Sequence, residues 1–472
     1  MPLFSSTHRS MRRVFKGRPA LWDLQRILPL LLVVQVALGV FFMAYMRQSR
    51  PALVQTDLLS INMRGVEVRA VASDTGGWNA LSPVLRRALE SGAVVRVHLS
   101  GASARALRSG GLSPDTRLKV TLSTESKGMP VGELWPQSTV SSFVGQPHDI
   151  TIVGTSASKE GIVVAADALC TSAARQSLSL VEDMYRVSGG TLQSIVARCP
   201  ERVAAVRACV PDSVSYKLMR EREPGKAAVE LGLQVRICGG PQFDGTARAA
   251  AKDGALELKR EALRAKLGLR PDTLLVLAVG QVHGTSEMAS LLLEGVMHAK
   301  AAGRLAKADA AILLRMHPRA DPADKELAMQ IKNDHPGYFT TALELGVAAM
   351  GSYVSSEDLL PAADVVVSGH STVNYHAILW GIPGVVYLGT PTELEQMAQE
   401  KGLPVQPEVE VGAAWRAGTP EEFSAILGHL AQEDKSQMFR SLKAAQARFS
   451  AANDGNAADR AWRYTLNISP DR

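Results

Sequence analysis

The sequence predicts an α/β protein with two doubly wound halves, each built on a parallel sheet. Three observations support this fold class. Short apolar runs alternate with segments of helical length along most of the chain, as in βαβ units. Turns rich in Gly, Ser and Thr follow several of these runs. The 472 residues are 46% hydrophobic and 21% charged, which fits two or three domains and excludes a disordered chain, a collagen or a coiled coil.

We assign residues 64–230 to the first half, after a linker at residues 47–63. The predicted strands are Val66–Ala72, Val94–Leu99 and Ile150–Val153, and the predicted helices are Ala80–Glu90, Ala102–Arg108 and Gly161–Ala173. Because a helix separates each strand from the next, we expect the strands to pair in parallel. Residues 73–79 are expected to form a glycine-bearing turn between the first strand and the first helix.

We assign residues 231–433 to the second half, and residues 434–472 to C-terminal helices and a tail that serve in packing. The predicted strands are Leu274–Val279, Ala310–Met316, Asp364–Val367 and Gly384–Leu388, and the predicted helices are Glu287–Ala301, Pro322–Asn333 and Val373–Trp380. Three polar turns follow the first three of these strands. Open parallel sheets bind ligands at the carboxyl ends of their strands, so these turns are candidate ligand contacts.

A membrane anchor is expected near the N-terminus. Ile27–Met46 is an apolar run that would span about 30 Å as a helix. Bulky residues fill its exit side, which favours an uncleaved signal-anchor over a cleaved signal peptide. Most of the basic residues that flank the run lie in the tail at residues 1–26, which predicts a cytoplasmic N-terminus and a type II, single-pass protein. The expected location is the Golgi in a eukaryote or the inner membrane in a bacterium.

The charge distribution argues against a nucleic-acid partner. The first 50 residues hold eight Lys or Arg and one Asp, which leaves 44 basic and 45 acidic residues in the rest of the chain. Phosphate neutralisation needs a basic face, which this nearly neutral body does not predict. The four cysteines, Cys170, Cys199, Cys209 and Cys238, form no Cys-x-x-Cys pair. They indicate neither a zinc site nor a dense disulfide scaffold and leave the redox compartment open.

The turn Ser368–Thr372 is the strongest candidate for an anion site, because it opens a helix. Exposed N–H groups and the positive end of the helix dipole attract an anion there, and the hydroxyls of Ser371 and Thr372 add hydrogen bonds. In the alternative reading, one of these hydroxyls only caps the helix. The glycines around the turn favour phosphate binding. His317-Pro318 ends an earlier strand, where the histidine could contact a phosphate or act as an acid, or could be structural.

Two of these motifs carry a family resemblance. Residues 363–372, followed by Gly381–Val385, resemble the donor-site signature of GT-B glycosyltransferases. His317-Pro318 followed by Ser371-Thr372 is similar to the His-Pro and Ser-Ser/Thr motifs of bacterial sialyltransferases, polysialyltransferases and capsule transferases. Within those families the motifs imply contacts with the phosphate of a sugar nucleotide.

Two further segments extend the resemblance to about residues 64–450. Cys238–Asp244 resembles the interdomain strand exit of the same group, and Ser73–Pro83 resembles its acceptor-side glycine loop. The resemblance implies two Rossmann-like doubly wound domains of the GT-B type. It implies a donor site made of Gly280, Gln281, His317, Ser368, Gly369, His370, Ser371, Thr372 and His376, and an acceptor site with Gly76, Gly77 and Asn79.

One residue departs from the family pattern. Many GT-B enzymes hold the ribose with a glutamate early in the helix after the donor turn, where this chain has His376. Imidazole lacks the two acceptors of a carboxylate, which disfavours a uridine diphosphate sugar and leaves a cytidine monophosphate sugar or a degenerate site. For the acceptor hydroxyl we expect Asp74 as the base, with Glu160 second. The alternatives are a helix cap for Asp74 and a first-turn dipole contact for Glu160.

The function we expect is a membrane-anchored glycosyltransferase that moves a sugar from a nucleotide-activated donor to a glycan or lipid-linked acceptor. No Asp-x-Asp follows an apolar strand, so we expect no metal and no other cofactor. The motifs of P-loop enzymes, dinucleotide oxidoreductases and α/β-hydrolases are absent. Three rivals stay open: a nucleotide-sugar 2-epimerase, a CDP-alcohol phosphotransferase, and an inactive membrane scaffold of the same fold.

Overall fold

The computed structural model describes residues 61–100, 103, 117–122, 137–156, 158–184, 188–252, 254–305, 310–317, 320–339, 355–369, 371–431 and 437–468. Apart from Ile61, the described residues belong to one compact unit, Asn62–Arg472. The expected anchor at residues 27–46 lies outside the described residues, as does most of the expected helix at Ala102–Arg108. Among the residues that the structure describes, no helix has the length and apolar character needed to cross a membrane.

The first sheet has seven parallel strands in the order β3-β2-β1-β4-β5-β6-β7. Their bounds are β1 Glu67–Ala72, β2 Val94–Leu99, β3 Leu118–Leu122, β4 His148–Gly154, β5 Ala174–Val181, β6 Val206–Val210 and β7 Gln234–Ile237. The chain runs outward from β1 to β3 and returns to β4 on the other side of β1. The strand order therefore reverses between β1 and β4, as in a doubly wound sheet.

The second sheet has five parallel strands in the order β12-β11-β10-β8-β9. Their bounds are β8 Leu274–Val279, β9 Ala310–Arg315, β10 Val365–Ser368, β11 Gly384–Leu388 and β12 Trp415–Ala417. Here the order reverses between β8 and β10. The prediction of an α/β protein with two parallel sheets is confirmed.

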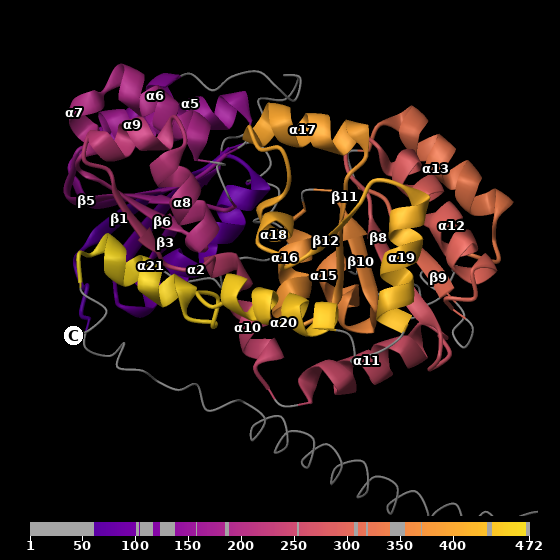
Figure 1. Cartoon of the computed structure of the whole chain (residues 1–472). Coiled ribbons are helices and arrows are strands. Elements are labelled where there is room, and N and C mark those ends of the chain that lie inside the picture. The colour runs from indigo at the N-terminus through magenta and orange to yellow at the C-terminus, as the bar shows by residue number, and fades with distance from the viewer. Residues whose placement is uncertain are drawn as a thin grey trace, which may run out of the picture. The chain divides into compact units, whose positions relative to one another are not determined.

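Helices cover both faces of each sheet (Figure 1). Those of the first half are α2 Thr75–Glu90, α4 Gln137–Gly145, α5 Lys159–Thr171, α6 Gly189–Arg198, α7 Pro200–Val203, α8 Ser213–Glu221 and α9 Gly225–Glu230. Those that follow are η2 Pro241–Phe243, α10 Asp244–Ala250, α11 Ala255–Lys266, α12 Thr285–Ala301, α13 Pro322–Asp334, α15 Ser356–Leu359, η3 Leu360–Ala362, α16 Thr372–Leu379, α17 Pro391–Lys401, α18 Pro407–Glu410, α19 Pro420–Ala431, α20 Gln437–Phe449 and α21 Ala457–Thr465.

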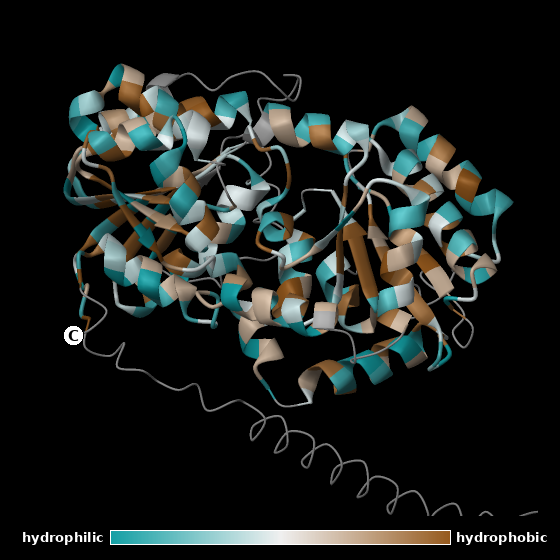
Figure 2. Cartoon of the chain, in the orientation of Figure 1, coloured by the Kyte–Doolittle hydropathy of each residue, from teal (hydrophilic) through white to brown (hydrophobic). Residues whose placement is uncertain are grey.

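The strand β10 shows why these sequences form buried parallel strands. Val365 and Val367 pack with α12 on one face of the sheet, against Leu292 and Val296. Val366 packs on the other face, in the cluster that contains α16. A strand covered on both faces has no polar alternation, so it appears in the sequence as a continuous apolar run. Figure 2 shows this pattern, with hydrophobic strands between helices that are polar on their outer sides. Each fully buried valine contributes roughly 1.5–3 kcal/mol to folding.

The division between the halves differs from the expected one at two places. β7 pairs with β6, so the first sheet extends past the boundary expected at residue 230. At the other end of the chain, α21 packs on the first half, where Ala461 and Trp462 join the buried cluster of α2. Figure 1 shows this yellow C-terminal helix beside the strands of the first half. Residues 434–472 therefore complete the first half rather than only the second.

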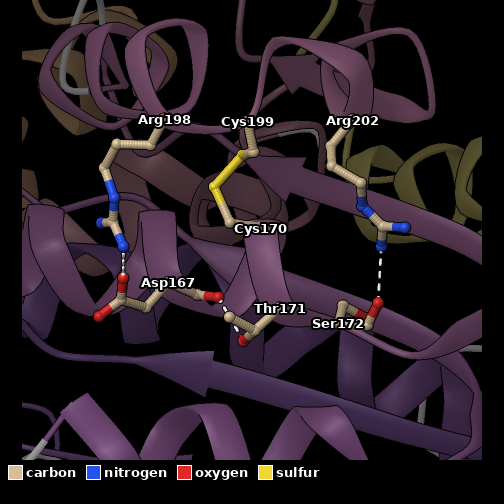
Figure 3. Close-up of a disulfide and its surroundings, with 7 residues drawn as sticks. All are labelled: Asp167, Cys170, Thr171, Ser172, Arg198, Cys199 and Arg202. Atoms are coloured by element: carbon tan, nitrogen blue, oxygen red, sulfur yellow. Dashed lines mark hydrogen bonds and ion pairs between the residues drawn. A yellow bond between two sulfur atoms is a disulfide. The ribbon is translucent and has the colours of Figure 1, made fainter.

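Two disulfides link all four cysteines, and both lie in the first half. Cys170 in α5 bonds to Cys199, which precedes α7, with the two Cα atoms 5.7 Å apart. Figure 3 shows this bond between two arginine contacts, the Arg198–Asp167 ion pair and a 2.6 Å hydrogen bond from Arg202 to the Ser172 carbonyl. Cys209 at the end of β6 bonds to Cys238 just after β7. The sequence had indicated no dense scaffold, and it did not assign these pairs.

Candidate functional site

The reversal point of the second sheet brings the expected donor turns together. Val279, the last residue of β8, pairs with Ser368 of β10 on one side and with Arg315 of β9 on the other. The turns after these three strands therefore leave the same edge of the sheet next to one another. This edge is where open parallel sheets bind ligands.

The turn before α16 has the cap geometry that was the alternative reading. Ser371 is the N-cap, and its Oγ accepts a 3.3 Å hydrogen bond from the Val373 N–H. Ser371 and Thr372 are half-buried, and the buried Ser368 donates its hydroxyl to the Gly369 carbonyl at 3.1 Å. His370 lies outside the described residues. A serine cap is neutral, so it leaves the positive end of the helix without a compensating charge from its own cap.

Two residues of this region were missed by the sequence analysis. A β-carbon built on Gly369 would lie 2.2 Å from Oε2 of Glu393, so the carboxyl group of Glu393 packs directly on this glycine. Glu393 belongs to the first turn of α17 and is 1% exposed. Asn374, in the first turn of α16, is 0% exposed, and its amide has no hydrogen-bond partner in the part of the chain that the structure describes. A glutamate in a polar first turn and an asparagine in an apolar helix carried no distinguishing signal.

The turn after β8 is closed rather than open. The Gly280 N–H donates to the Arg315 carbonyl at 2.8 Å, and a β-carbon on Gly280 would lie 2.9 Å from Oγ1 of Thr285. Gly280 therefore permits close packing and does not offer its amide to a ligand. The half-buried Gln281 has a marginal 3.5 Å contact from its Nε2 to the Val279 carbonyl. The first turn of α12 is capped by Asp324 of α13, which accepts the Thr285 N–H at 2.8 Å and the Ser286 N–H at 2.9 Å.

The two histidines of the predicted donor site have different surroundings. His317 is half-buried, two residues beyond the end of β9, and its carbonyl accepts the Ala320 N–H at 3.0 Å. His376 lies on α16, where its Nδ1 is 2.7 Å from Oγ1 of Thr246 and its ring meets Phe243 edge-on. Burial lowers the pKa of His376, which favours the neutral imidazole.

The first sheet repeats the arrangement at its own reversal point. Val71 of β1 pairs with Val153 of β4, so the turns after these two strands are adjacent. α2 begins at Thr75, and not at Ala80 as expected, so the glycines of the predicted loop form the first turn of a helix. A β-carbon on Gly77 would lie 2.1 Å from the Thr155 carbonyl, so only glycine fits there.

Of the catalytic and acceptor residues predicted in the first half, Asp74 lies at this turn as a helix cap, whereas Glu160 and Asn79 are exposed on helices. Asp74 is the N-cap of α2, and its Oδ1 accepts the Gly77 N–H at 2.7 Å, which is the alternative reading. Glu160 is exposed in the first turn of α5, whose N-cap is Ser158. Asn79 is exposed on α2. The geometry thus gives Asp74 a structural role as the cap of α2.

A carboxylate that the sequence analysis missed lies closer to the glycine turn. A β-carbon on Gly76 would be 2.2 Å from Oδ2 of Asp183, which follows β5 and is half-buried. The Asp183 N–H donates to Thr155 Oγ1 at 3.0 Å, and Gln242 donates to the Asp183 carbonyl at 2.7 Å. β5 alternates serine with leucine, so it was not recognised as a strand, and the acidic residues at its end were not placed at this edge.

Elements that follow the carboxyl ends of both sheets touch one another. Asp212, the N-cap of α8 after β6, accepts a 3.5 Å hydrogen bond from the Tyr375 hydroxyl of α16. The same hydroxyl accepts a 2.6 Å hydrogen bond from Asn453, whose Oδ1 accepts the Gly240 N–H at 2.6 Å. Asp212 is 0% exposed, and burial raises its pKa to about 6. The two halves are therefore joined by a buried polar network that includes α16, the helix that follows the donor turn.

The motif Cys238–Asp244 contacts the C-terminal segment of the chain, and these contacts account for its glycine and its aspartate. Gly239 has φ +84°, and a β-carbon there would lie 2.3 Å from the Ala452 carbonyl. Asp244 accepts the N–H groups of Ala457 and Ala458 at 2.8 and 2.9 Å, so it caps α21. The chain therefore crosses between the halves at two neighbouring places. The motif has a structural role in holding this crossing.

Cavities lie elsewhere in the described residues. One of about 10 Å³ is lined by Glu182 and Leu218 in the first half. Another of about 290 Å³ is lined by Thr273 and Ala310, at the amino ends of β8 and β9 and thus at the edge opposite the donor turns. Neither of these two cavities is lined by a residue of the predicted donor or acceptor site.

Comparisons with known proteins agree with this geometry. A family model described as CDP-Glycerol:Poly(glycerophosphate) glycerophosphotransferase matches residues 232–467, which is half of the chain. The match includes the second sheet, its donor turns and α21. A search among curated proteins gave no match.

Several solved structures have a similar fold. The UDP-GlcNAc 2-epimerase from Neisseria meningitidis bound to UDP-GlcNAc is 11% identical, with 85% of this chain and 100% of that chain covered and a TM-score of 0.53. The S. aureus MnaA-UDP co-structure is 15% identical, with 86% and 98% covered and a TM-score of 0.52. The wall teichoic acid polymerase TagF is 10% identical, with 85% and 88% covered and a TM-score of 0.46. At these identities the likeness concerns the fold, which is of the GT-B type, and the expected similarity to sialyltransferases is not shown.

Proposed function

Since the chain belongs to the CDP-glycerol:poly(glycerophosphate) glycerophosphotransferase family, we propose that it is a transferase that takes a group from a nucleotide-activated donor. The group is passed to a hydroxyl of a glycan or lipid-linked acceptor. The observation that carries this proposal is the adjacency of Val279 and Ser368, which places the β8, β9 and β10 turns at one edge. Within the proposal, the α16 turn contacts the donor phosphate through Ser371 and Thr372, with His317 beside it.

The chemistry requires a base in the first half. In the proposed step the acceptor oxygen forms a bond to the transferred group, and the nucleotide leaves with the electron pair of the bond that breaks. The acceptor proton goes to a carboxylate. We assign this role to Asp183 rather than to Asp74. Asp74 is held as the cap of α2 by the Gly77 N–H at 2.7 Å, whereas the Asp183 carboxylate lies on Gly76 and accepts a longer 3.3 Å hydrogen bond from Gln242.

Two kinds of transferred group are compatible with this step. A sugar would be transferred by breaking a carbon–oxygen bond, whereas a CDP-alcohol would give up an alcohol phosphate by breaking a phosphorus–oxygen bond. The family match favours a CDP-alcohol as the donor. His376, which stands where many GT-B enzymes have a glutamate, leaves a sugar donor open. We also propose that the reaction needs no metal and that residues 27–46 anchor the chain in the Golgi membrane or the bacterial inner membrane as a type II protein.

Nucleotide binding and transfer test the proposal together. The full chain is screened by thermal shift with cytidine, uridine and guanosine nucleotides, since a bound ligand raises the melting temperature by mass action. Transfer of a labelled group is then measured for Ser371→Ala and His317→Ala. We expect each to reduce transfer about tenfold or more, through a lost hydrogen bond to the donor.

A matched control separates binding from helix capping. Ser355 caps α15 through the same kind of hydrogen bond, its Oγ accepting the Asp358 N–H at 3.1 Å. Ser355→Ala should therefore cost similar stability without reducing transfer. Unchanged transfer in both Ser371→Ala and His317→Ala would contradict the proposed site.

A further inference from the structure

The short helix η2 contacts both halves of the chain through two consecutive side chains. Gln242 donates a hydrogen bond from its Nε2 to the carbonyl of Asp183, which follows β5 in the first half. Phe243 stacks on Tyr375 of α16, with the ring centroids 4.2 Å apart and the ring planes 7° from parallel. Phe243 is fully buried in the cluster that covers one face of the second sheet. Two adjacent residues therefore join the segment that holds Asp183 to the helix that follows the donor turn.

The amide of Gln242 is oriented by Asp183. Its Nε2 lies 2.7 Å from the Asp183 carbonyl oxygen and 3.3 Å from Oδ1 of the carboxylate, so it has two acceptors there. The reversed amide would place Oε1 against the same two oxygens, and an oxygen of an ionised carboxylate or a carbonyl donates no hydrogen bond. In the observed orientation Oε1 is buried and has no hydrogen-bond partner among the described residues. The Gln242 side chain therefore directs its hydrogen bonds to Asp183.

Asp183 is held at its backbone and at its carboxylate. Its N–H donates to Oγ1 of Thr155 at 3.0 Å, and its carbonyl accepts from Gln242, so the backbone is fixed on two sides. The half-buried side chain could otherwise adopt other rotamers. Gln242 contacts Oδ1, while Oδ2 lies over Gly76, where a β-carbon would be 2.2 Å away. One carboxylate oxygen thus faces η2, and the other faces the glycine turn at the start of α2.

We propose that Gln242 is a positioning residue, which holds the Asp183 carboxylate at the glycine turn and at a set distance from α16. This inference rests on the proposed function, in which a carboxylate of the first half takes the proton of the acceptor hydroxyl. Gln242 exchanges no proton and contacts neither substrate in this role. Its effect is on geometry, because a displacement of about 1 Å can cost roughly 10²-fold in rate. Since Phe243 packs on Tyr375, the same short helix places the base relative to the donor.

A double-mutant cycle on the full chain tests this role. Turnover is measured with labelled CDP-glycerol as the donor and poly(glycerophosphate) as the acceptor, and the dissociation constant of CDP is measured by calorimetry. Gln242→Met keeps the length of the side chain without its N–H donors. We expect it to lower kcat about tenfold, while the KM for the donor and the dissociation constant of CDP change by less than about twofold. In the Asp183→Asn background the same substitution should change kcat by less than about twofold, because no base is left to position.

Two further variants separate this role from folding. Gln242→Asn keeps the amide but is one methylene shorter, so it should also lower kcat, and it replaces Gln242→Met if that variant does not fold. Gln399→Met is the matched control, since Gln399 donates from Nε2 to Oε1 of Glu395 at 2.9 Å on α17. The control should retain kcat within about twofold, because it loses the same kind of hydrogen bond at an exposed site. Thermal unfolding checks that each variant is folded.

Each other outcome has a defined meaning. Unchanged kcat in both folded Gln242 variants overturns the inference, as does a loss of kcat by the same factor in the presence and absence of the Asp183 carboxylate. A change in turnover that follows weaker CDP binding overturns it too, by placing the effect at the donor. If Asp183→Asn keeps full turnover, the transferase function stands and the role of Gln242 falls with the assignment of the base. If the folded, unchanged protein neither binds CDP nor transfers the label, the proposed function fails and the inference falls with it.

Discussion

The carboxylate of Asp183 packs on the α-carbon of Gly76, at a point where a β-carbon would lie 2.2 Å from Oδ2. The second half has the same relationship between Glu393 and Gly369. In each half an acidic side chain from the segment that follows a neighbouring strand fills the space above the glycine at the reversal point of the sheet: Asp183 follows β5, and Glu393 lies in the first turn of α17, after β11. The glycines therefore do more than form tight turns, because they admit a carboxyl group to the edge where ligands bind.

Substitution of the two adjacent glycines of α2 should separate this role from folding. In Gly76→Ala the new methyl group meets the end of a flexible side chain, so we expect a stability change within about 1 kcal/mol, helped by the higher helix propensity of alanine. In Gly77→Ala the methyl group meets the Thr155 carbonyl at 2.1 Å, and we expect a loss of about 1–3 kcal/mol or more. Urea unfolding measures both. Equal losses in the two variants would contradict the contact assignment.

Activity should respond to Asp183 more than to Asp74. Loss of a general base reduces turnover by about 10²–10⁴-fold, so Asp183→Asn should lower kcat within that range with little change in stability. Asp74→Asn keeps an oxygen for the Gly77 N–H and should cost roughly 1 kcal/mol or less in stability, with most of the turnover retained. Steady-state kinetics and thermal unfolding of both variants measure this. The reverse order of effects would return the role of base to Asp74.

The pattern of the sequence predicted those parts of the fold that local chemistry determines. Leu274–Val279 and Gly384–Leu388 match their strands residue for residue, because buried parallel strands appear as uninterrupted apolar runs. Val94–Leu99 also matches its strand, although Arg96 and His98 interrupt its apolar run. β5 has Ser177 and Ser179 on alternate positions and was missed. The place of α21 was also missed, because its packing on the first half is a contact between distant parts of the chain.

The candidate site also has parts that local sequence predicted and parts that it did not. The turns after β8 and β10 were found because glycines and hydroxyls mark the exits of those strands, and the turn after β9 was found from its His317-Pro318 pair. The partners of those turns were not found, because Asp324 and Glu393 lie in the first turns of other helices, where acidic residues are common. Their approach to Ser286 and Gly369 depends on the order of strands in the sheet, which one sequence does not reveal.

Asp212 should make stability fall as the pH rises through the weakly acidic range. Burial raises its pKa from an ordinary 3.8 to about 6, so the folded protein binds the proton more tightly than the unfolded chain does. The stabilisation is complete below about pH 4 and is lost as the pH rises toward 6 and above, by an amount of roughly 3 kcal/mol. Asp212→Asn keeps an oxygen for the Ser215 N–H and removes this dependence.

Denaturant unfolding between pH 4 and 8 measures the effect of Asp212. Other buried groups titrate in the same range, so the difference between the unchanged protein and Asp212→Asn is the relevant quantity. The free energy of unfolding of the unchanged protein minus that of Asp212→Asn should fall by about 2–4 kcal/mol from pH 4 to pH 8, so that the unchanged protein is relatively most stable at low pH. A difference that stays constant with pH would mean that Asp212 titrates normally in the folded protein.

The two disulfides should form in the cell and should both be needed for full stability. Each closes a separation of 29 residues, for which loop entropy predicts roughly 3–4 kcal/mol of stabilisation. Protein made in an oxidising compartment should contain no thiol that reacts with a maleimide after denaturation, and Cys170→Ala with Cys199→Ala should lower the free energy of unfolding by about that amount.

Cys209→Ala with Cys238→Ala should lower the free energy of unfolding by a similar amount. This pair should also weaken nucleotide binding, because Cys238 begins the crossing that holds Gly240 against Asn453. If four reactive thiols are found in protein isolated with its thiols blocked, the bonds do not form in the cell, and the expected placement of the folded body outside the cytoplasm would lose this support.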